Sequence, residues 1–177
     1  MLRTLTVALV LNLVGGSIAS AATWSMGGLM ESRMQKEVNP DYAELKNTGG
    51  IFAKVGFWPM AVLLESAREE RDSGSGGLKV SSESTSLGVW GRYEFRDPGT
   101  WSPFAGIGAG MHFDKVTTTF AGQRDVRSGQ RNFMGVGGGI TKSFWSHVLV
   151  ELEARAVTVQ QRNDPMLSAL FRAGVQF

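Results

Sequence analysis

Hydrophobic and polar residues alternate along most of the chain after residue 22, with the two-residue period of a β-strand. The segment 167–177 is the clearest, because its odd-numbered residues are all apolar, while its even-numbered positions include Ser168, Arg172 and Gln176. Successive side chains of a strand point to opposite faces, so this pattern predicts a strand with one apolar and one polar face. Helical periodicity is weak throughout this region.

The preceding segment shows which face meets lipid. Its even-numbered residues from Val148 to Ala156 are apolar, whereas Glu151, Glu153 and Arg155 follow one another on the other face. The buried face of a soluble β-sandwich seldom carries such a series of charges. In a membrane β-barrel, the apolar face meets lipid and the charged face lines the interior.

Eight such segments are present. An even number of antiparallel strands returns the chain to the side of the membrane on which the first strand starts. The predicted fold is therefore all-β, an eight-stranded antiparallel up-and-down transmembrane β-barrel. The facing of the third segment is uncertain, because apolar residues fall on both of its faces. The predicted strands are 23–34, 51–58, 60–68, 84–95, 101–113, 131–144, 148–157 and 167–177.

Connections of alternating length separate these strands. Short turns are expected at Pro59, 97–99 and 145–147, and longer polar loops at 35–50, 69–79, 119–130 and 160–166, with 73–77 as a flexible tip. Short turns face the periplasm in outer-membrane barrels. Aromatic residues support this orientation, because interfacial belts favour them. The predicted inner belt is Trp24, Phe57, Trp58, Phe95, Trp101, Phe144, Trp145 and Phe177, and the thinner outer belt is Phe113, Phe120 and Phe133.

The first 21 residues have the pattern of an export signal. A positive start at Arg3 precedes an apolar stretch that ends near Ile18, and Ala19-Ser20-Ala21 supplies the small residues of a cleavage site. We expect residues 1–21 to be a cleaved signal peptide and residues 22–177 to form the barrel. A transmembrane anchor is the alternative, but the apolar core is short for a span.

Composition narrows the functional classes. The chain of 177 residues suits one domain, and its formal net charge of +2 does not favour a nucleic-acid binder. Cysteine is absent, which excludes disulfides, zinc–thiolate sites and thiol nucleophiles. Only two histidines are present, so we expect no metal site and no cofactor.

Charged residues on the polar faces predict a network inside the barrel. Its expected members are Glu31, Arg33, Lys54, Arg92, Glu94, His112, Asp114, Glu151, Glu153, Arg155 and Arg172. Buried charges require partners, so we expect Arg92 and Arg155 to pair with Glu94, Glu151 or Glu153. The favoured interpretation is a salt-bridged plug that closes the barrel, and the alternative is a narrow polar path for very small solutes.

Two glycine runs lie on the polar faces of neighbouring strands, at 106–110 and 135–139. Each has glycine at every second position, but no helix follows to hold a phosphate, which argues against a nucleotide site. We expect these glycines to face inward and leave room for bulky side chains from other strands, namely Phe52, Trp90 and Leu149.

Basic residues gather in the segments assigned to the outer rim: Arg68, Arg71, Lys115, Arg124, Arg127, Arg131 and Arg162. Guanidinium groups bind phosphates well, so these residues are candidates for contacts with lipopolysaccharide. Solvated loops of mixed charge are an equal alternative, because Glu69, Glu70, Asp72 and Asp125 lie among them.

Taken together, the signal peptide, the eight amphipathic strands and the ending 171–177 resemble the small outer-membrane barrels of the OmpA/OmpX type. The segment 101–110 is similar to a hairpin and strand start in that family. The resemblance implies a monomeric protein of the cell outer membrane with a structural or surface-interaction role. It also implies that the assembly machinery reads the terminal aromatic residue, here Phe177.

Two rival functions are weaker. Some small barrels are lipid A-modifying enzymes with a His-x-Ser pattern, but here His112 is followed by Phe113 and Asp114, so we expect no enzyme. A soluble lipocalin-like binder would turn its apolar side chains inward, whereas here the charges share the predicted inner face.

Overall fold

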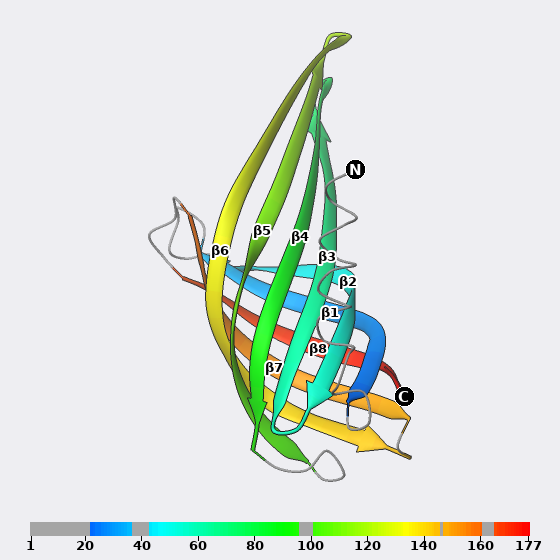
Figure 1. Ribbon diagram of the computed structural model, residues 1–177. Helices are drawn as coiled ribbons and strands as arrows, with labels where there is room; N and C mark the ends of the chain where they lie inside the picture. Colours follow the sequence, from blue (N-terminus) through cyan, green and yellow to red (C-terminus); the bar gives the residue numbers. More distant parts are fainter. Residues whose placement is uncertain (1–21, 37–42, 96–100, 146, 161–164) are drawn as a thin grey trace, which may run out of the picture.

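The computed structural model describes residues 22–36, 43–95, 101–145, 147–160 and 165–177. The chain forms one closed barrel in which every strand is antiparallel to its neighbours and β1 pairs with β8 (Figure 1). The predicted fold is confirmed. The strands are β1 (Thr23–Lys36), β2 (Ala43–Phe57), β3 (Met60–Ser75), β4 (Leu78–Glu94), β5 (Ser102–Phe120), β6 (Gln123–Phe144), β7 (Val148–Val159) and β8 (Met166–Gln176).

The two faces of the barrel wall differ as the alternation predicts. Outward side chains such as Ile51, Ile107 and Met134 are exposed, whereas Leu63 and Trp90 point inward and are fully buried. No helix among the described residues is long and apolar enough to cross a membrane. A wall with apolar side chains outside and polar ones inside is typical of membrane barrels.

Aromatic side chains surround the end of the barrel that carries the short turns, the start of β1 and the end of β8. Six members of the predicted inner belt are exposed there: Trp24, Trp58, Phe95, Trp101, Trp145 and Phe177. The outer belt was partly wrong, because Phe133 points into the barrel, where its ring stacks on His112 at a centroid distance of 4.7 Å. Phe120 lies beyond the barrel wall, in the last residue pair of a hairpin.

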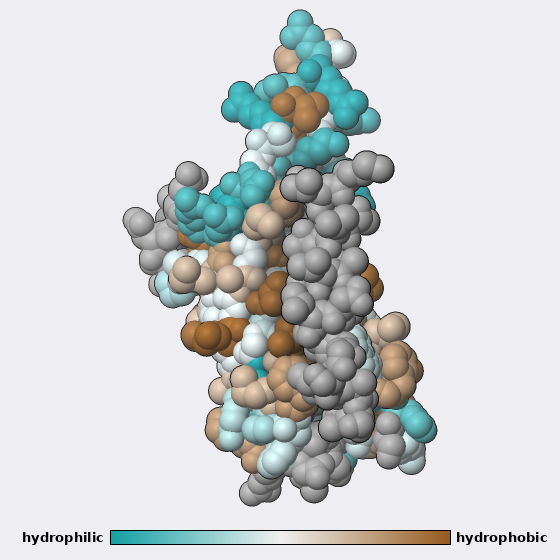
Figure 2. Space-filling view, viewed as in Figure 1, coloured by the Kyte–Doolittle hydropathy of each residue, from teal (hydrophilic) through white to brown (hydrophobic). Residues whose placement is uncertain are grey.

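Four strands, β3 to β6, rise beyond the other four and continue the barrel sheet as an open, four-stranded part (Figure 1). The β2–β3 pairing ends at Gly49 and Arg68, and the β6–β7 ladder ends at Phe133 and Val159. Beyond these points, residues 69–84 and 114–131 form two paired hairpins, which we call the extension. The extension is more hydrophilic than the wall below it (Figure 2).

The predicted loops 69–79 and 119–130 are therefore wrong, because both segments are strands joined by tight turns. In the first turn, Gly76 and Gly77 have φ of 61° and 84°, and the second turn places Ala121 and Gly122 at 48° and 81°. Two successive residues with positive φ match the twist of a β-hairpin. The expected flexible tip at 73–77 is likewise mostly strand, and the predicted loop 35–50 ends early because β2 begins at Ala43.

Candidate functional site: the charged barrel interior

Two glycine-lined strands create the space for the interior. A Cβ atom at Gly108 would lie 2.2 Å from the Trp90 ring, and one at Gly137 would lie 2.9 Å from Cγ of Arg155. The prediction that glycines make room for Trp90 is confirmed. For Phe52 the neighbouring glycine is instead Gly174, where an added Cβ would lie 3.0 Å from the ring. Strands β5 and β6 thus supply space, and side chains from the neighbouring strands β4 and β7 fill it.

An ion-pair network occupies that space, and we call it the core network. It contains as many carboxylates as basic groups, from β2, β3, β4, β7 and β8, so it links strands that are not neighbours in the barrel. Its members are Lys54, Glu65, Arg92, Glu94, Glu151, Glu153, Arg155 and Arg172.

Glu151 is the most enclosed carboxylate of the core network, with 0% of its surface exposed. Its oxygens lie 2.9 Å from Nζ of Lys54 and 2.7 Å from a guanidinium nitrogen of Arg92, and Thr141 donates its hydroxyl at 3.4 Å. Lys54 also donates to Glu94 at 2.5 Å. Two cations from β2 and β4 thereby share one carboxylate from β7.

Glu153 lies next to it on the inner face of β7 and binds three guanidinium groups. Arg92 approaches it at 2.5 Å, Arg155 at 2.7 Å and Arg172 at 2.7 Å. Arg92 and Arg172 are respectively 1% and 0% exposed. Charges this deeply buried are tolerated only when they are paired, so each group depends on the others for its own burial.

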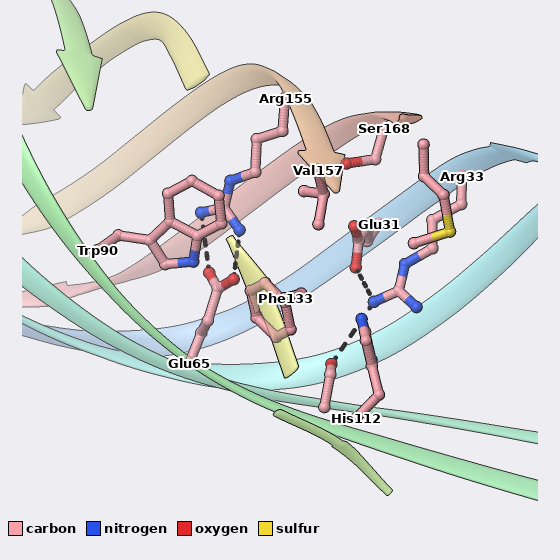
Figure 3. A pocket seen from close by; sticks show the side chains of 11 residues that line it. Glu31, Arg33, Glu65, Trp90, His112, Phe133, Arg155, Val157 and Ser168 are labelled. Atoms are coloured by element: carbon pink, nitrogen blue, oxygen red, sulfur yellow. Dashed lines mark hydrogen bonds and ion pairs between the residues drawn. The ribbon is translucent and has the colours of Figure 1, made fainter. Parts of the chain in front are cut away.

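Two of these cations also make cation–π contacts with aromatic rings. The guanidinium carbon of Arg155 lies 3.6 Å from the ring centroid of Trp90, and that of Arg92 lies 4.3 Å from the centroid of Phe104. The negative face of an aromatic ring attracts a cation, more strongly where water is excluded. Figure 3 shows Arg155 lying against Trp90 and directed at Glu65.

Glu65 is the network member that the sequence analysis missed. Its carboxylate binds Arg155, with one contact at 3.0 Å, and also Arg172 at 2.8 Å, so it connects β3 to β7 and β8. The run Ala61-Val62-Leu63-Leu64 is apolar on both faces and hid the facing of the strand. The charge of Glu65 is the signal that could have revealed it, because a carboxylate favours the polar interior of a membrane barrel over the lipid-facing wall.

A second group of polar side chains lies at the mouth of the barrel below the extension. Arg33 donates to Glu31 at 2.7 Å and to Ser86 at 3.5 Å, close to His112 (Figure 3). With residues of the core network, they line a cavity of about 20 Å³. That volume suits roughly one water molecule, and the Ser168 hydroxyl that lines the cavity has no protein partner.

Within the part of the chain that the structure describes, no hydrogen bond joins His112 to a nucleophilic side chain. Ser86 lies directly opposite on β4, but its hydroxyl donates to the carbonyl of Ala67 at 3.4 Å. Nucleophilic catalysis requires a base within hydrogen-bond reach of the attacking oxygen. The mouth therefore has the composition of a polar lining around a small cavity.

Asp114 lies apart from the core network, at the base of the extension. It receives hydrogen bonds from Nε of Arg131 at 3.0 Å and from Ser84 at 2.8 Å, and its side chain is 25% exposed. The structure therefore places Asp114 at the rim from which the extension rises. It also ties Arg131, a candidate for lipopolysaccharide contact, to this carboxylate.

The remaining predicted basic residues divide between the two faces of the extension. Arg71 and Arg127 share the face that continues the barrel interior, because they lie opposite Ser82 and Val116 in one row. The outer face carries Arg68, Lys115 and Arg124. Arg68 pairs there with Glu70 and Glu83. Arg162 lies outside the described residues, as does the predicted signal peptide 1–21.

Phe177 closes the barrel next to the first strand. Its N–H and C=O each bond to the backbone of Trp24 at 2.8 Å, and its side chain is exposed. The terminal residue thus lies in the seam between β8 and β1.

No protein-family model matches the sequence, and no curated protein matches it. Solved structures do match its fold. The attachment invasion locus protein Ail of Yersinia pestis aligns at a TM-score of 0.59 and 15% identity, covering 89% of this chain and 99% of Ail. A major outer membrane protein of Thermus thermophilus aligns at 0.67 and 10% identity, covering 89% of this chain and 100% of that chain.

Outer membrane protein H of Pseudomonas aeruginosa is also similar, with a TM-score of 0.56, 12% identity, and coverage of 89% of this chain and 100% of that one. At such low identity the likeness concerns the fold. The predicted resemblance to small outer-membrane barrels is confirmed at that level.

Proposed function

We propose that this protein is a closed outer-membrane barrel that holds a rigid two-hairpin platform at the cell surface, in a structural or surface-interaction role. The observation that carries the proposal is the contrast between the two halves of the molecule. The core network fills the barrel, while β3 to β6 remain paired up to their turns beyond it. An apolar wall with an aromatic girdle at the turn end supports a membrane location.

Cysteine labelling on intact cells tests this topology. The chain has no cysteine, so single-cysteine variants are unambiguous. Gly76→Cys lies in the turn of the first hairpin, and its matched control, His147→Cys, lies in a short turn at the opposite end. We expect a membrane-impermeant maleimide to label position 76 on intact cells and position 147 only after permeabilisation. The reverse pattern, or equal labelling of both, contradicts the proposal.

We also propose that the outer face of the extension contacts lipopolysaccharide phosphates. Lys115 lines a shallow groove on this face with Phe113, Thr85 and Gln130, next to the apolar wall. A cation beside an interfacial aromatic residue is well placed for a phosphate at headgroup depth. Arg68 lies in the same row as Phe113, whereas Arg127 faces the other side.

Added lipopolysaccharide should therefore raise the unfolding temperature of the wild-type barrel in detergent, and Lys115→Gln should reduce that increase. Arg127→Gln is the matched control, because it removes a charge that is also exposed, but from the other face. Equal effects of the two substitutions would show that contact with the outer face is not specific.

Phe177 is proposed to serve as an assembly signal as well as a seam residue. Phe177→Ala should retain the two backbone hydrogen bonds to Trp24 while removing the exposed ring. We expect normal refolding into detergent but a reduced amount of barrel in cell membranes. A parallel loss in both settings would assign the residue a purely structural role.

A further inference from the structure

The upper part of β6 presents an open backbone edge. Lower down, β7 covers this side of β6, and the last contact is a hydrogen bond of 2.8 Å from the N–H of Gln160 to the carbonyl of Asn132. Above it, no described strand pairs with that side, and all side chains from Gln123 to Gln130 are exposed. An unpaired strand edge is a template for pairing with another chain.

The direction of the backbone groups follows from that last hydrogen bond. The carbonyl of Asn132 points away from β5, and the β5–β6 register is continuous from Phe120↔Gln123 to Ser102↔Thr141. Backbone groups alternate sides along a strand, so even-numbered residues of β6 direct N–H and C=O to the open edge. Arg124, Val126 and Ser128 therefore offer donors and acceptors there.

The charges on this edge are complementary to themselves in one antiparallel register. In that register, which is centred on Val126, Val126 of one copy lies opposite Val126 of a second copy. Asp125 of each copy then lies opposite Arg127 of the other. Opposite charges on directly facing residues stabilise a strand pair, and like charges destabilise it. Within one chain, Arg127 already lies 3.1 Å from Asp125, although both side chains are largely exposed.

Neighbouring registers are unfavourable. Centring the pair on Arg124, Asp125 or Arg127 sets identical charges opposite one another. Centring it on Ser128 requires the carbonyl of Asn132, which already accepts from Gln160.

The other open edge of the extension, on β3, opposes like charges. Its side chains are exposed from Glu70 to Ser75. A two-fold register centred on Arg71 or Asp72 sets identical charges opposite one another, and one centred on Glu70 sets Glu70 opposite itself between two Glu69–Arg71 pairs. Such charges protect an edge from pairing. Of the two edges, only that of β6 has a register in which opposite charges face one another and no like charges do.

We propose that the β6 edge, residues 123–130, pairs antiparallel with the same edge of a second copy held in a facing membrane. In copies that share one membrane, every β6 runs from the hairpin turn toward the membrane, so their β6 strands are parallel. Antiparallel pairing therefore requires a second copy in a membrane that faces the first. The four residues from Gln130 to Val126 span about 13 Å. With Gln130 of each copy at its membrane surface, the two membranes then approach to about 26 Å, which requires a thin sugar layer. Each pair of β6 edges binds weakly, but many such pairs between two membranes together give a stable attachment.

The experiment uses two populations of phosphatidylcholine vesicles that carry the mature chain and different dyes. Wild-type vesicles should cluster with one another. Asp125→Arg or Arg127→Asp should each reduce clustering at least tenfold, because each sets like charges opposite at both positions. Mixing the Asp125→Arg population with the Arg127→Asp population should restore it, because the two edges are complementary. Asp72→Arg is the control, since it makes the same charge change on β3, in the row of Val126 and next to the row of Asp125.

A cross-link adds a readout that needs no charge reversal. Val126→Cys places one thiol opposite its own copy at about 5.5 Å between Cα atoms, within the range of a disulfide. Under mild oxidation it should form dimers between vesicles, whereas Asp72→Cys should not. Failure of the mixed populations to cluster, or equal cross-linking at both positions, overturns the proposal. The gel shift of folded barrel, measured on every variant, identifies any that fail to insert.

Discussion

The barrel interior and the extension both carry many charges, but the two regions use them differently. In the core network, Arg92, Arg172 and Glu151 are at most 1% exposed and each has several partners. In the extension, the side chains of Arg127 and Asp125 are 85% and 62% exposed and form a single contact. Removing one partner of a buried ion pair leaves an uncompensated charge, whereas water replaces a lost partner at the surface.

The largest effect should follow from Glu151→Ala. The substitution leaves Lys54 and Arg92 short of a carboxylate inside the barrel. We expect the free energy of unfolding to fall by about 4 kcal/mol. Urea unfolding in lipid vesicles, followed by the gel mobility of the folded barrel, measures this loss. Asp125→Ala is the matched removal of an extension carboxylate and should leave the unfolding midpoint unchanged.

Phenylalanines offer the next comparison. Phe133→Ala empties a position that is 7% exposed and stacked on His112, so we expect a loss of about 3 kcal/mol. Phe120→Ala removes an exposed ring from the hairpin end and should cost far less. The same unfolding assay compares them, and equal losses would mean that the extension is packed as tightly as the barrel.

Glycines sharpen the contrast further. Gly108→Ala forces a Cβ into the ring of Trp90, and overpacking of this kind costs about 2 kcal/mol. Gly129→Ala, on the extension, has nothing within 4 Å of the added atom. Unfolding midpoints of the two variants should differ clearly. Equal unfolding midpoints for Gly108→Ala and Gly129→Ala would contradict the close packing of Trp90 against β5.

The smallest effect is expected at the boundary between the two regions. Arg131→Ala removes the partner of Asp114, but both side chains are partly exposed. Water can solvate the remaining carboxylate, so we expect a loss of about 1 kcal/mol or less. A loss as large as that of Glu151→Ala would place this pair energetically within the core network.

The barrel fold was predictable because its strands meet two different environments. Alternation at 148–157 and 167–177 assigned Glu151, Arg155 and Arg172 to the inner face, where the structure places them. The extension was harder to predict because both of its faces are polar, which removes the alternation. Its only clear signal was Gly76-Gly77, a dipeptide that favours a two-residue hairpin turn.

The composition of the site was predictable only where one face was apolar. Glu65 escaped because Leu63 and Leu64 occupy opposite faces of β3. Which guanidinium binds which carboxylate depends on contacts across the lumen, such as Arg92 from β4 with Glu153 from β7. Strand alternation says which side chains face inward, but not how far each one reaches across the barrel.

Planar-bilayer conductance of the purified wild-type protein tests the central claim most directly, namely that the core network closes the barrel. If Arg92, Arg172 and Glu151 fill the lumen as the structure places them, the inserted protein should carry no resolvable current. The gel shift of the folded barrel in the same preparation confirms that insertion took place. Repeated, uniform current steps from the wild-type protein would contradict a closed interior and favour the narrow polar path instead.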